Sequence, residues 1–213
     1  MKVAIDKGFS PSKIVCVGRN YAAHAAELGN EAPTEPLLFL KAPSAIVFNG
    51  DPIVIPPQSE RVEHEGELAV VIDRTCRRLT ADKDPSPYIR GYTCLNDVTA
   101  RDLQRRDVQF TRAKSFDTFC PIGPHIETDL DVRDISVATR LNGEVKQQGR
   151  TSQMLFSVDY LIRYISNVMT LNAGDVIATG TPAGVSQMRP GDVCEVEIEG
   201  IGTLRNPVTA FTS

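Results

Sequence analysis

Two glutamates of the chain are spaced so that they can share a ligand. Glu65 and Glu67 lie two residues apart in an apolar segment that predicts a strand (65–73), so both side chains leave the same face. Carboxylates this close repel each other, and burial raises the pKa of one sharply unless a cation lies between them. Asp97, at the end of another predicted strand, is placed to supply a third oxygen. Three carboxylates favour a hard cation such as Mg²⁺ or Mn²⁺. The alternative is a solvated strand face.

His24 and Glu27 have the spacing of a histidine and a supporting carboxylate. They lie three residues apart in a predicted helix (20–29), and therefore on one helix face. A carboxylate beside an imidazole fixes its tautomer and raises its basicity, which suits a general base that activates water. The alternative is an exposed pair that contributes little to stability. The helix has few large apolar side chains, which predicts a flap that becomes ordered over a bound ligand.

Other kinds of chemistry find little support in the motifs. His64 and Glu65 begin like the zinc-binding pattern H-E-x-x-H, but Leu68 stands where the second histidine is needed, which excludes that class. The chain has neither G-x-G-x-x-G nor G-x-x-x-x-G-K-[ST], so nucleotide binding is not indicated. The segment 179–184 is rich in glycine and threonine and offers amides and hydroxyls to an anion, although such a segment is more often a tight turn.

The composition is that of an ordinary globular protein. The chain has 213 residues, 41% of them hydrophobic and 23% charged, which predicts one domain over residues 1–213. A net charge of −4 and an aromatic content of 6% argue against nucleic-acid and membrane partners. The five cysteines are scattered and form no C-x-x-C pair, so neither a disulfide framework nor a zinc site is indicated. Without an apolar run of secretory or membrane-spanning length, a cytoplasmic location is expected.

Strand signals outnumber helix signals, which predicts a mostly β fold. The main predicted strands cover residues 13–18, 65–73, 90–97, 175–179 and 193–199, and the predicted helices cover 20–29, 98–106 and 157–169. Ser157 is the expected N-cap of the last helix, while Asn20 and Gly29 are the expected caps of the first. Glu195 and Glu197 alternate with apolar residues, which predicts an edge strand with one solvated face.

Several of these residues belong to longer motifs that follow one another along the chain. The motifs are Val17-Gly18-Arg19-Asn20-Tyr21, followed by His24 and Glu27-Leu28; Phe39-Leu40-Lys41; His64-Glu65-Gly66-Glu67-Leu68-Ala69; Asn96-Asp97-Val98-Thr99-Ala100-Arg101-Asp102; Ala113-Lys114-Ser115-Phe116-Asp117; Asn142-Gly143-Glu144; and Gly174-Asp175-Val176-Ile177, followed by Thr179-Gly180-Thr181-Pro182. From about residue 13 to residue 207 the series resembles the catalytic domain of the fumarylacetoacetate hydrolase family. It is most similar to the short bacterial type, which lacks the extra N-terminal domain of longer members.

The resemblance implies a mixed α/β fold that is mostly β, namely a β-roll of the fumarylacetoacetate hydrolase type with short helices and a helical lid. It also implies a homodimer and Mg²⁺ or Mn²⁺ as the cofactor. The implied metal ligands are Glu65, Glu67 and Asp97, and the implied catalytic residues are His24 and Glu27 on the lid together with Lys114, which stabilises negative charge. The implied substrate-binding residues are Arg19, Gln104, Thr181 and Lys41.

The implied substrates are small β-diketo or α-keto acids. In an acylpyruvate such as fumarylpyruvate, His24 with Glu27 would activate water for attack on the 4-carbonyl, and cleavage of the C3–C4 bond would leave pyruvate enolate. The metal and Lys114 would bear the charge of that enolate. The expectation is therefore a metal-dependent acylpyruvate hydrolase. Alternatives are an oxaloacetate decarboxylase or tautomerase, a 2-hydroxyhepta-2,4-diene-1,7-dioate isomerase and, from another class, a non-catalytic metal-binding module.

Overall fold

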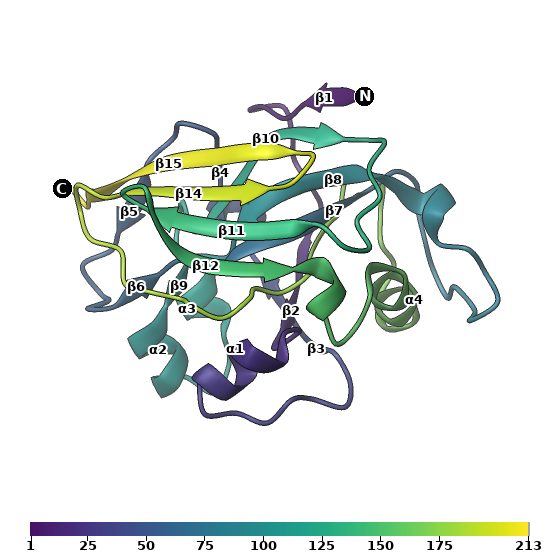
Figure 1. Cartoon of the computed structure of the whole chain (residues 1–213), viewed down its shortest axis with the longest axis horizontal. Coiled ribbons are helices and arrows are strands. Elements are labelled where there is room, and N and C mark those ends of the chain that lie inside the picture. The colour runs from purple at the N-terminus through teal and green to yellow at the C-terminus, as the bar shows by residue number, and fades with distance from the viewer. Residues whose placement is uncertain (213) are drawn as a thin grey trace.

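The computed structural model describes residues 1–212 and consists mainly of short strands (Figure 1). The strands are β1 (Lys2–Ala4), β2 (Ile14–Gly18), β3 (Leu37–Lys41), β4 (Ile46–Phe48), β5 (Ile53–Ile55), β6 (Val62–Glu63), β7 (Gly66–Ile72), β8 (Ile89–Asn96), β9 (Thr99–Ala100), β10 (Cys120–Glu127), β11 (Ser136–Leu141), β12 (Glu144–Arg150), β13 (Val176–Ala178), β14 (Val193–Ile198) and β15 (Gly202–Ala210). The helices are α1 (Ala22–Glu27), α2 (Arg101–Arg106), α3 (Thr111–Lys114) and α4 (Val158–Val168), and short 3₁₀ turns lie at Pro43–Ala45, Ser86–Tyr88 and Thr151–Gln153.

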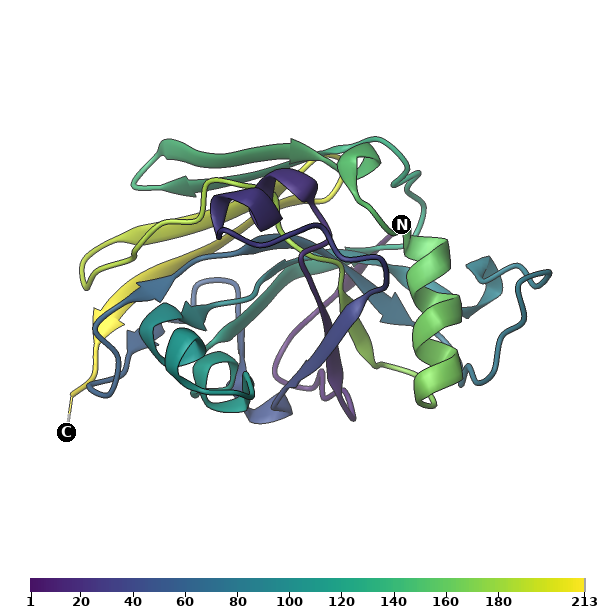
Figure 2. The ribbon, with the colours of Figure 1, turned by 90° about the horizontal axis from the view of Figure 1, so that it is seen from below.

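The strands form two stacked sheets, seen edge-on in Figure 2. The first sheet has eight strands in the order β1-β10-β8-β7-β13-β2-β3, with β4 paired to β10. The second has five strands in the order β12-β11-β14-β15-β5, and β6 pairs with β9 in a separate two-stranded ribbon. None of the helices within residues 1–212 has the length and hydropathy that a bilayer-spanning segment requires.

Strand β7 lies in the middle of the first sheet and is buried on both faces. Leu68 belongs to an apolar cluster that also contains Val196 of the second sheet, whereas Ala69 belongs to the cluster on the opposite face. Because side chains alternate along a strand, Glu65 and Glu67 share the face of Ala69. The two glutamates therefore point away from the second sheet, as the spacing predicted.

Gly66, between the two glutamates, allows the sheets to pack closely. A Cβ at this position would lie 2.0 Å from Thr139 Oγ1 of β11 and 3.2 Å from Val196 Cγ1 of β14. A larger residue would push β11 away from β7, because interiors at native packing density cannot absorb such an overlap. Packing between the sheets therefore explains why a glycine separates the two glutamates.

The predicted elements are largely confirmed. Helix α4 begins after Ser157, whose Oγ accepts a hydrogen bond from the N–H of Tyr160 at 3.3 Å. Gly29 ends the first helix with φ at 70°, and the N–H groups of Gly29 and Asn30 donate to the carbonyls of Ala26 and Ala25. This is the Schellman arrangement, in which a left-handed glycine closes the last turn of a helix.

Three details of the sequence analysis are wrong. Asn20 does not cap the first helix; its side chain accepts from the N–H of Phe156 at 2.8 Å and donates to the carbonyl of Thr179 at 2.7 Å. Helix α2 begins at Arg101, because the two residues before it pair as β9. Strand β14 lies between β11 and β15 and is not an edge strand. Alternating polarity marks one solvated face, which interior strands of antiparallel sheets also have.

Asp175 connects the start of β2 to the turn before β13. Its carboxylate accepts hydrogen bonds from Ser12 Oγ at 2.6 Å, from the N–H groups of Ser12 and Lys13 at 3.0 and 3.1 Å, and from the N–H of Asn172 at 2.7 Å. Lys13 Nζ forms an ion pair with the same carboxylate. Burial opposes the charge, but these donors outweigh burial and lower the pKa of Asp175.

We expect Asp175→Ala to lower the free energy of unfolding by about 3 kcal/mol, because several donors lose a charged acceptor. The lowered pKa stabilises the fold above the pKa of an unfolded aspartate, and this contribution is lost as the pH falls through the folded-state pKa. Urea unfolding should therefore show a smaller difference between variant and wild type near pH 3 than at pH 7. Asp73→Ala, at an exposed aspartate, is the control; equal losses in the two variants would contradict this role of Asp175.

Candidate active site

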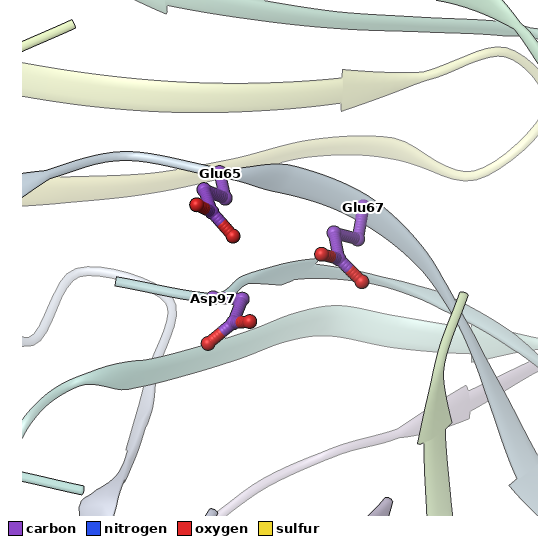
Figure 3. Close-up of side chains that lie close together, drawn as sticks. All are labelled: Glu65, Glu67 and Asp97. Carbon is purple, nitrogen blue, oxygen red and sulfur yellow. The ribbon is translucent and has the colours of Figure 1, made fainter. Parts of the chain in front are cut away.

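Glu65, Glu67 and Asp97 come together from two neighbouring strands (Figure 3). Glu65 directly precedes β7, Glu67 lies in β7, and Asp97 directly follows β8. The strands are antiparallel with Gly66 opposite Asn96, and the N–H of Asp97 donates to the carbonyl of Glu65 at 2.8 Å. One oxygen from each carboxylate lies within 4.8 Å of the others, and all three residues are buried.

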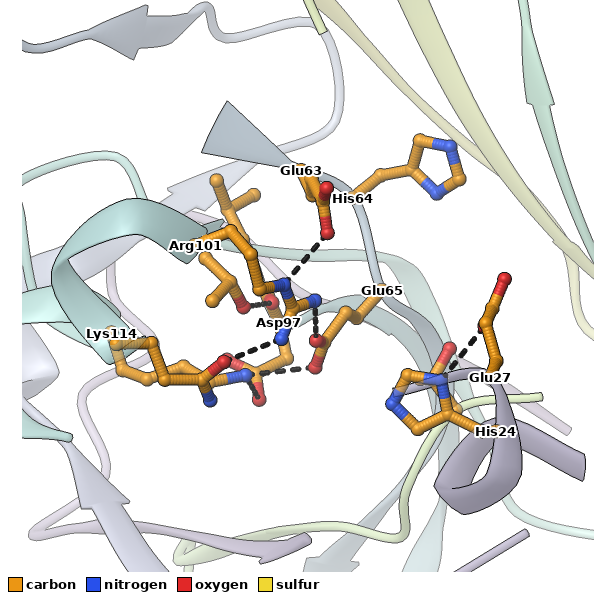
Figure 4. A network of polar contacts seen from close by, with 12 residues as sticks. His24, Glu27, Glu63, His64, Glu65, Asp97, Arg101 and Lys114 are labelled. Atoms are coloured by element: carbon orange, nitrogen blue, oxygen red, sulfur yellow. Dashed lines mark hydrogen bonds and ion pairs between the residues drawn. The ribbon is translucent and has the colours of Figure 1, made fainter. Parts of the chain in front are cut away.

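Cationic side chains hold two of these carboxylates (Figure 4). Lys114 Nζ, at the end of α3, donates to Glu65 Oε2 at 2.8 Å and to Asp97 Oδ2 at 2.6 Å. Lys41 Nζ, at the end of β3, donates to Asp97 Oδ1 at 2.6 Å. The guanidinium of Arg101, at the start of α2, pairs with the Glu65 carboxylate. All three cations are buried, so their charges are weakly screened by water.

Glu67 has no cationic side chain in direct contact among the described residues. Its Oε2 accepts a hydrogen bond from the N–H of Gly180 at 2.7 Å. Burial, together with the charges of Asp97 and Glu65, raises the pKa of Glu67 well above its usual range. Burial also opposes the charge of Glu65. The adjacent Lys114 and Arg101 outweigh this effect of burial and lower the pKa of Glu65. Three converging oxygens with one uncompensated carboxylate fit a hard divalent cation, which would supply the missing positive charge.

His24 and Glu27 lie on α1, beside this cluster (Figure 4). His24 Nδ1 lies 3.3 Å from Glu27 Oε2, and the N–H of Gly184 donates to both carboxylate oxygens of Glu27 at 3.1 Å. The His24 ring is close enough to Glu65 that a protonated imidazole would lower the pKa of that carboxyl. With Nδ1 directed at Glu27, Nε2 is the nitrogen that can take a proton from a ligand or from water.

Helix α1 packs against the rest of the protein in this structure. Tyr21 and Ala25 are buried, Tyr21 forms an isolated β-bridge with Met154, and Glu27 is bonded to the turn that carries Gly184. These contacts explain how a helix with few large apolar side chains is held in position. Its movement as a lid stays a prediction.

One pocket of about 250 Å³ brings the predicted residues together. Those that line it are Arg19, His24, Glu65, Glu67, Asp97, Gln104, Lys114 and Thr181. Glu27 and Lys41 are not among the lining residues, but they contact two that are, His24 and Asp97. The other walls are largely apolar and include Leu28, Leu37, Phe39 and Phe110. The pocket therefore has a charged floor, formed by Glu65, Glu67, Asp97 and Lys114, and a wall that is mostly apolar.

The sequence analysis assigned no role to Arg101 or Arg105, although both line the pocket. Arg101 lies three residues before Gln104 and hence on the same helix face, which is the signal that could have identified it. In the structure, Arg101 Nη1 donates to Gln104 Oε1 at 2.5 Å, and Arg101 Nε donates to Glu63 Oε2 at 2.7 Å. Arg101 thus orients Gln104 as well as neutralising Glu65.

The protein thus has two stacked sheets beside a pocket in which three clustered carboxylates and a histidine–glutamate pair form a candidate metal-dependent active site. The sequence profile described as "Fumarylacetoacetate (FAA) hydrolase C-terminal" matches residues 13–209. The chain belongs to the fumarylacetoacetate hydrolase family. The predicted fold, mixed α/β and mostly β, is confirmed by the topology and by the related structures.

Some of the relatives have names that state a reaction. The mitochondrial oxaloacetate decarboxylase of Dictyostelium discoideum is 45% identical over 198 residues, which cover 90% of this chain and 90% of that protein. Oxaloacetate tautomerase YisK of Bacillus subtilis is 43% identical over 212 residues, which cover 93% of this chain and 70% of that protein. The family is one of enzymes, and these relatives indicate keto-acid chemistry within it.

Related solved structures extend the range of reactions. Fumarylpyruvate hydrolase from Pseudomonas aeruginosa, in complex with Mn²⁺ and pyruvate, is 29% identical and has a TM-score of 0.90; the match covers 99% of this chain and 96% of that one. 2-Hydroxyhepta-2,4-diene-1,7-dioate isomerase from Mycobacterium marinum is 48% identical with a TM-score of 0.89, covering 96% of this chain and 77% of that one.

The different partners of Glu67 and Asp97 predict opposite effects on the metal-free protein. We expect Glu67→Gln to leave the metal-free Tm unchanged or higher, because a buried carboxylate without a cationic partner loses its charge. Asp97→Asn should cost about 3 kcal/mol without metal, because Lys41 and Lys114 lose their shared counter-ion. Thermal unfolding in EDTA measures this contrast.

Both variants should also lose the rise in Tm that Mn²⁺ produces, since binding to the folded state alone stabilises it. Calorimetric titration with Mn²⁺ checks this directly. Wild-type Mn²⁺ affinity in either variant would remove that residue from the metal site.

Proposed function

We propose that this protein is a divalent-metal-dependent hydrolase that cleaves the C3–C4 bond of an acylpyruvate, such as fumarylpyruvate. The observation that carries the proposal is the His24–Glu27 pair beside the pocket whose floor holds the three clustered carboxylates. Hydrolysis of a β-diketo acid needs such a base, because water must lose a proton next to an activated carbonyl. The products are pyruvate and the carboxylic acid of the acyl group.

The pocket suits the pyruvate half of this substrate. Mg²⁺ or Mn²⁺ on Glu65, Glu67 and Asp97 would supply a Lewis acid for the 1-carboxylate and the 2-oxo group. Gln104 presents its amide hydrogens to the substrate, since its Oε1 already accepts from Arg101. These hydrogens suit an oxygen of the substrate carboxylate.

The histidine–glutamate pair serves the water. His24 takes the proton through Nε2, and its Nδ1–H donates to Glu27, which disperses the positive charge of the imidazolium. The Gly184 N–H holds the Glu27 carboxylate, so the ring keeps one orientation. The imidazolium then returns a proton to C3 of the departing pyruvate unit, which completes the reaction without an external acid.

Lys114 compensates the charge that develops when the C3–C4 bond breaks. Burial opposes the charge of Lys114, but Asp97 and Glu65 outweigh it and raise the pKa. Lys114 therefore stays an ammonium group and acts by electrostatic stabilisation of the enolate oxygen, not as a base.

Oxaloacetate decarboxylation or tautomerisation is the second candidate. Two observations favour it: the named relatives act on oxaloacetate, and Arg19 and Arg105 both line the pocket, where they suit a second carboxylate. Decarboxylation forms the same enolate without attack by water and needs no general base. Tautomerisation moves a proton at C3 and does need one, as does the isomerase reaction.

The experiment that tests the proposal is a substrate panel. We expect metal-dependent release of pyruvate from acetylpyruvate or fumarylpyruvate with Mg²⁺ or Mn²⁺, and none with EDTA. Oxaloacetate is assayed in parallel for loss of CO₂ and for enol–keto exchange. Turnover of oxaloacetate alone would favour the second candidate, and binding of Mn²⁺ without turnover of any of these acids would indicate a non-catalytic metal-binding module.

Glu27→Gln separates the reactions that need a base from the one that does not. We expect acylpyruvate hydrolysis to fall by about 10²-fold, the scale of general-base assistance. Metal-dependent oxaloacetate decarboxylation and oxalate affinity should stay within about threefold, which is under about 1 kcal/mol. Steady-state kinetics and calorimetry measure these effects, with Glu31→Gln at an exposed glutamate as the control. Equal losses of hydrolysis and decarboxylation would show that Glu27 is not dedicated to activating water.

A further inference from the structure

Gln147, in β12 of the second sheet, is a fully buried amide whose hydrogen-bonding groups are all used. Its Oε1 accepts from the Gly66 N–H at 3.0 Å and lies 3.0 Å from His64 Nδ1. Its Nε2 donates to Thr181 Oγ1 and to the Pro182 carbonyl, both at 2.7 Å. Two acceptor sites and two hydrogens are the full capacity of a carboxamide. The side chain therefore connects β12 to two other segments, residues 64–66 and 181–182, and all of its hydrogen-bonding capacity is used.

The orientation of this amide is determined by the backbone. The Gly66 N–H needs an acceptor, which places Oε1 rather than Nε2 beside it. His64 Nδ1 must then carry a hydrogen, and its Nε2 accepts from Ser186 Oγ at 2.8 Å. His64 and Ser186 thus close the network on the side away from the pocket.

The segments that Gln147 connects all carry parts of the site. Gly66 lies between Glu65 and Glu67, and Thr181 lines the pocket. Pro182 begins the turn that leads to Gly184, whose N–H holds the Glu27 carboxylate. One side chain on the opposite sheet is therefore bonded to the segments that carry the candidate metal ligands and that hold the carboxylate of the base.

The same turn packs tightly on β12. Gly184 has φ at 104°, and a Cβ there would lie 1.9 Å from the carbonyl oxygen of Lys146, the residue before Gln147. A Cβ at Gly149 would lie 2.7 Å from the ring of Pro182. The turn can lie this close to β12 only with glycine at both positions. The Gln147 hydrogen bonds therefore act where the turn and β12 are already in close steric contact.

We propose that Gln147 is a positioning residue that holds the Thr181–Gly184 turn against the strand carrying the metal-binding glutamates. It acts through Thr181. Thr181 Oγ1 accepts from Gln147 and donates its hydrogen to the Gly66 carbonyl at 2.8 Å, so one lone pair remains for the pocket. Thr181 therefore binds a donor, such as the attacking water or an enol O–H, and not a carboxylate oxygen. The catalytic consequence rests on the proposed function; the structural one does not.

The variant Gln147→Glu separates the acceptor role of the Gln147 side chain from its donor role. The variant keeps an oxygen for the Gly66 and His64 donors but loses both hydrogens that reach Thr181 and Pro182. We expect Mn²⁺ affinity within about threefold of wild type, with kcat lowered about tenfold or more and KM changed less than about threefold. Hydrogen exchange of residues 179–187 should become faster. Gln148→Glu, at the exposed neighbour, adds the same charge and should change none of these quantities.

A double-mutant cycle distinguishes positioning from general stability. If Gln147 acts through Thr181, the combination of Gln147→Glu with Thr181→Val should lower kcat no further than Thr181→Val alone. Multiplied effects on kcat would overturn the route through Thr181. Wild-type kcat and wild-type exchange in Gln147→Glu, measured below its Tm, would overturn the proposal.

Two further measurements keep the test of Gln147 independent of misfolding in the variant and of the proposed function. Gln147→Met serves if the buried carboxylate prevents folding; it removes all four bonds, so both Mn²⁺ affinity and kcat should fall, and unchanged values would overturn the proposal. If wild type turns over no keto acid in the panel, the proposed function fails. Hydrogen exchange and Mn²⁺ titration then still decide whether Gln147 holds the turn.

Discussion

The buried charges at the floor of the pocket constrain the rest of this structure. A carboxylate taken out of water is stable only with a counter-charge or several donors in contact, because desolvation costs several kcal/mol or more. Four carboxylates and three cations are buried here: Glu63, Glu65, Glu67, Asp97, Lys41, Arg101 and Lys114. The cations directly neutralise all but Glu67. A bound divalent cation would supply the counter-charge that Glu67 lacks.

This requirement explains the short elements around the pocket. The three cations come from three separate elements, since Lys41 ends β3, Arg101 begins α2 and Lys114 ends α3. Helices of four to six residues are too short to be stable alone. Helices α2 and α3 pack on each other, and α3 also packs on β3 and β9. Their ion pairs and this packing together hold them in place. The helices are thus part of the charged cluster as much as of the fold.

What the sequence predicts well is local. Alternation along a strand places Glu65 and Glu67 on one face, and helical spacing places His24 beside Glu27; both hold in the structure. Amphipathic spacing likewise identifies α4. The role of Gln147 has no local signal, because its partners lie more than thirty residues away along the chain. Asn20 shows the converse, since a residue type that favours helix caps is taken instead by long-range bonds.

The division between floor and wall also explains how related proteins carry different reaction names. Under the proposed function, the floor would stabilise negative charge on an oxygen of the pyruvate unit, and hydrolysis, decarboxylation and tautomerisation all generate that charge. The floor alone therefore does not select among these reactions. Selection would then fall to the groups that face the rest of the substrate. These are the proposed base on α1, Thr181, whose hydroxyl hydrogen is already donated to the Gly66 carbonyl, and the wall where Arg19 and Arg105 lie beside apolar side chains. A small change in that wall can exchange one substrate for another while the charge balance beneath it stays the same.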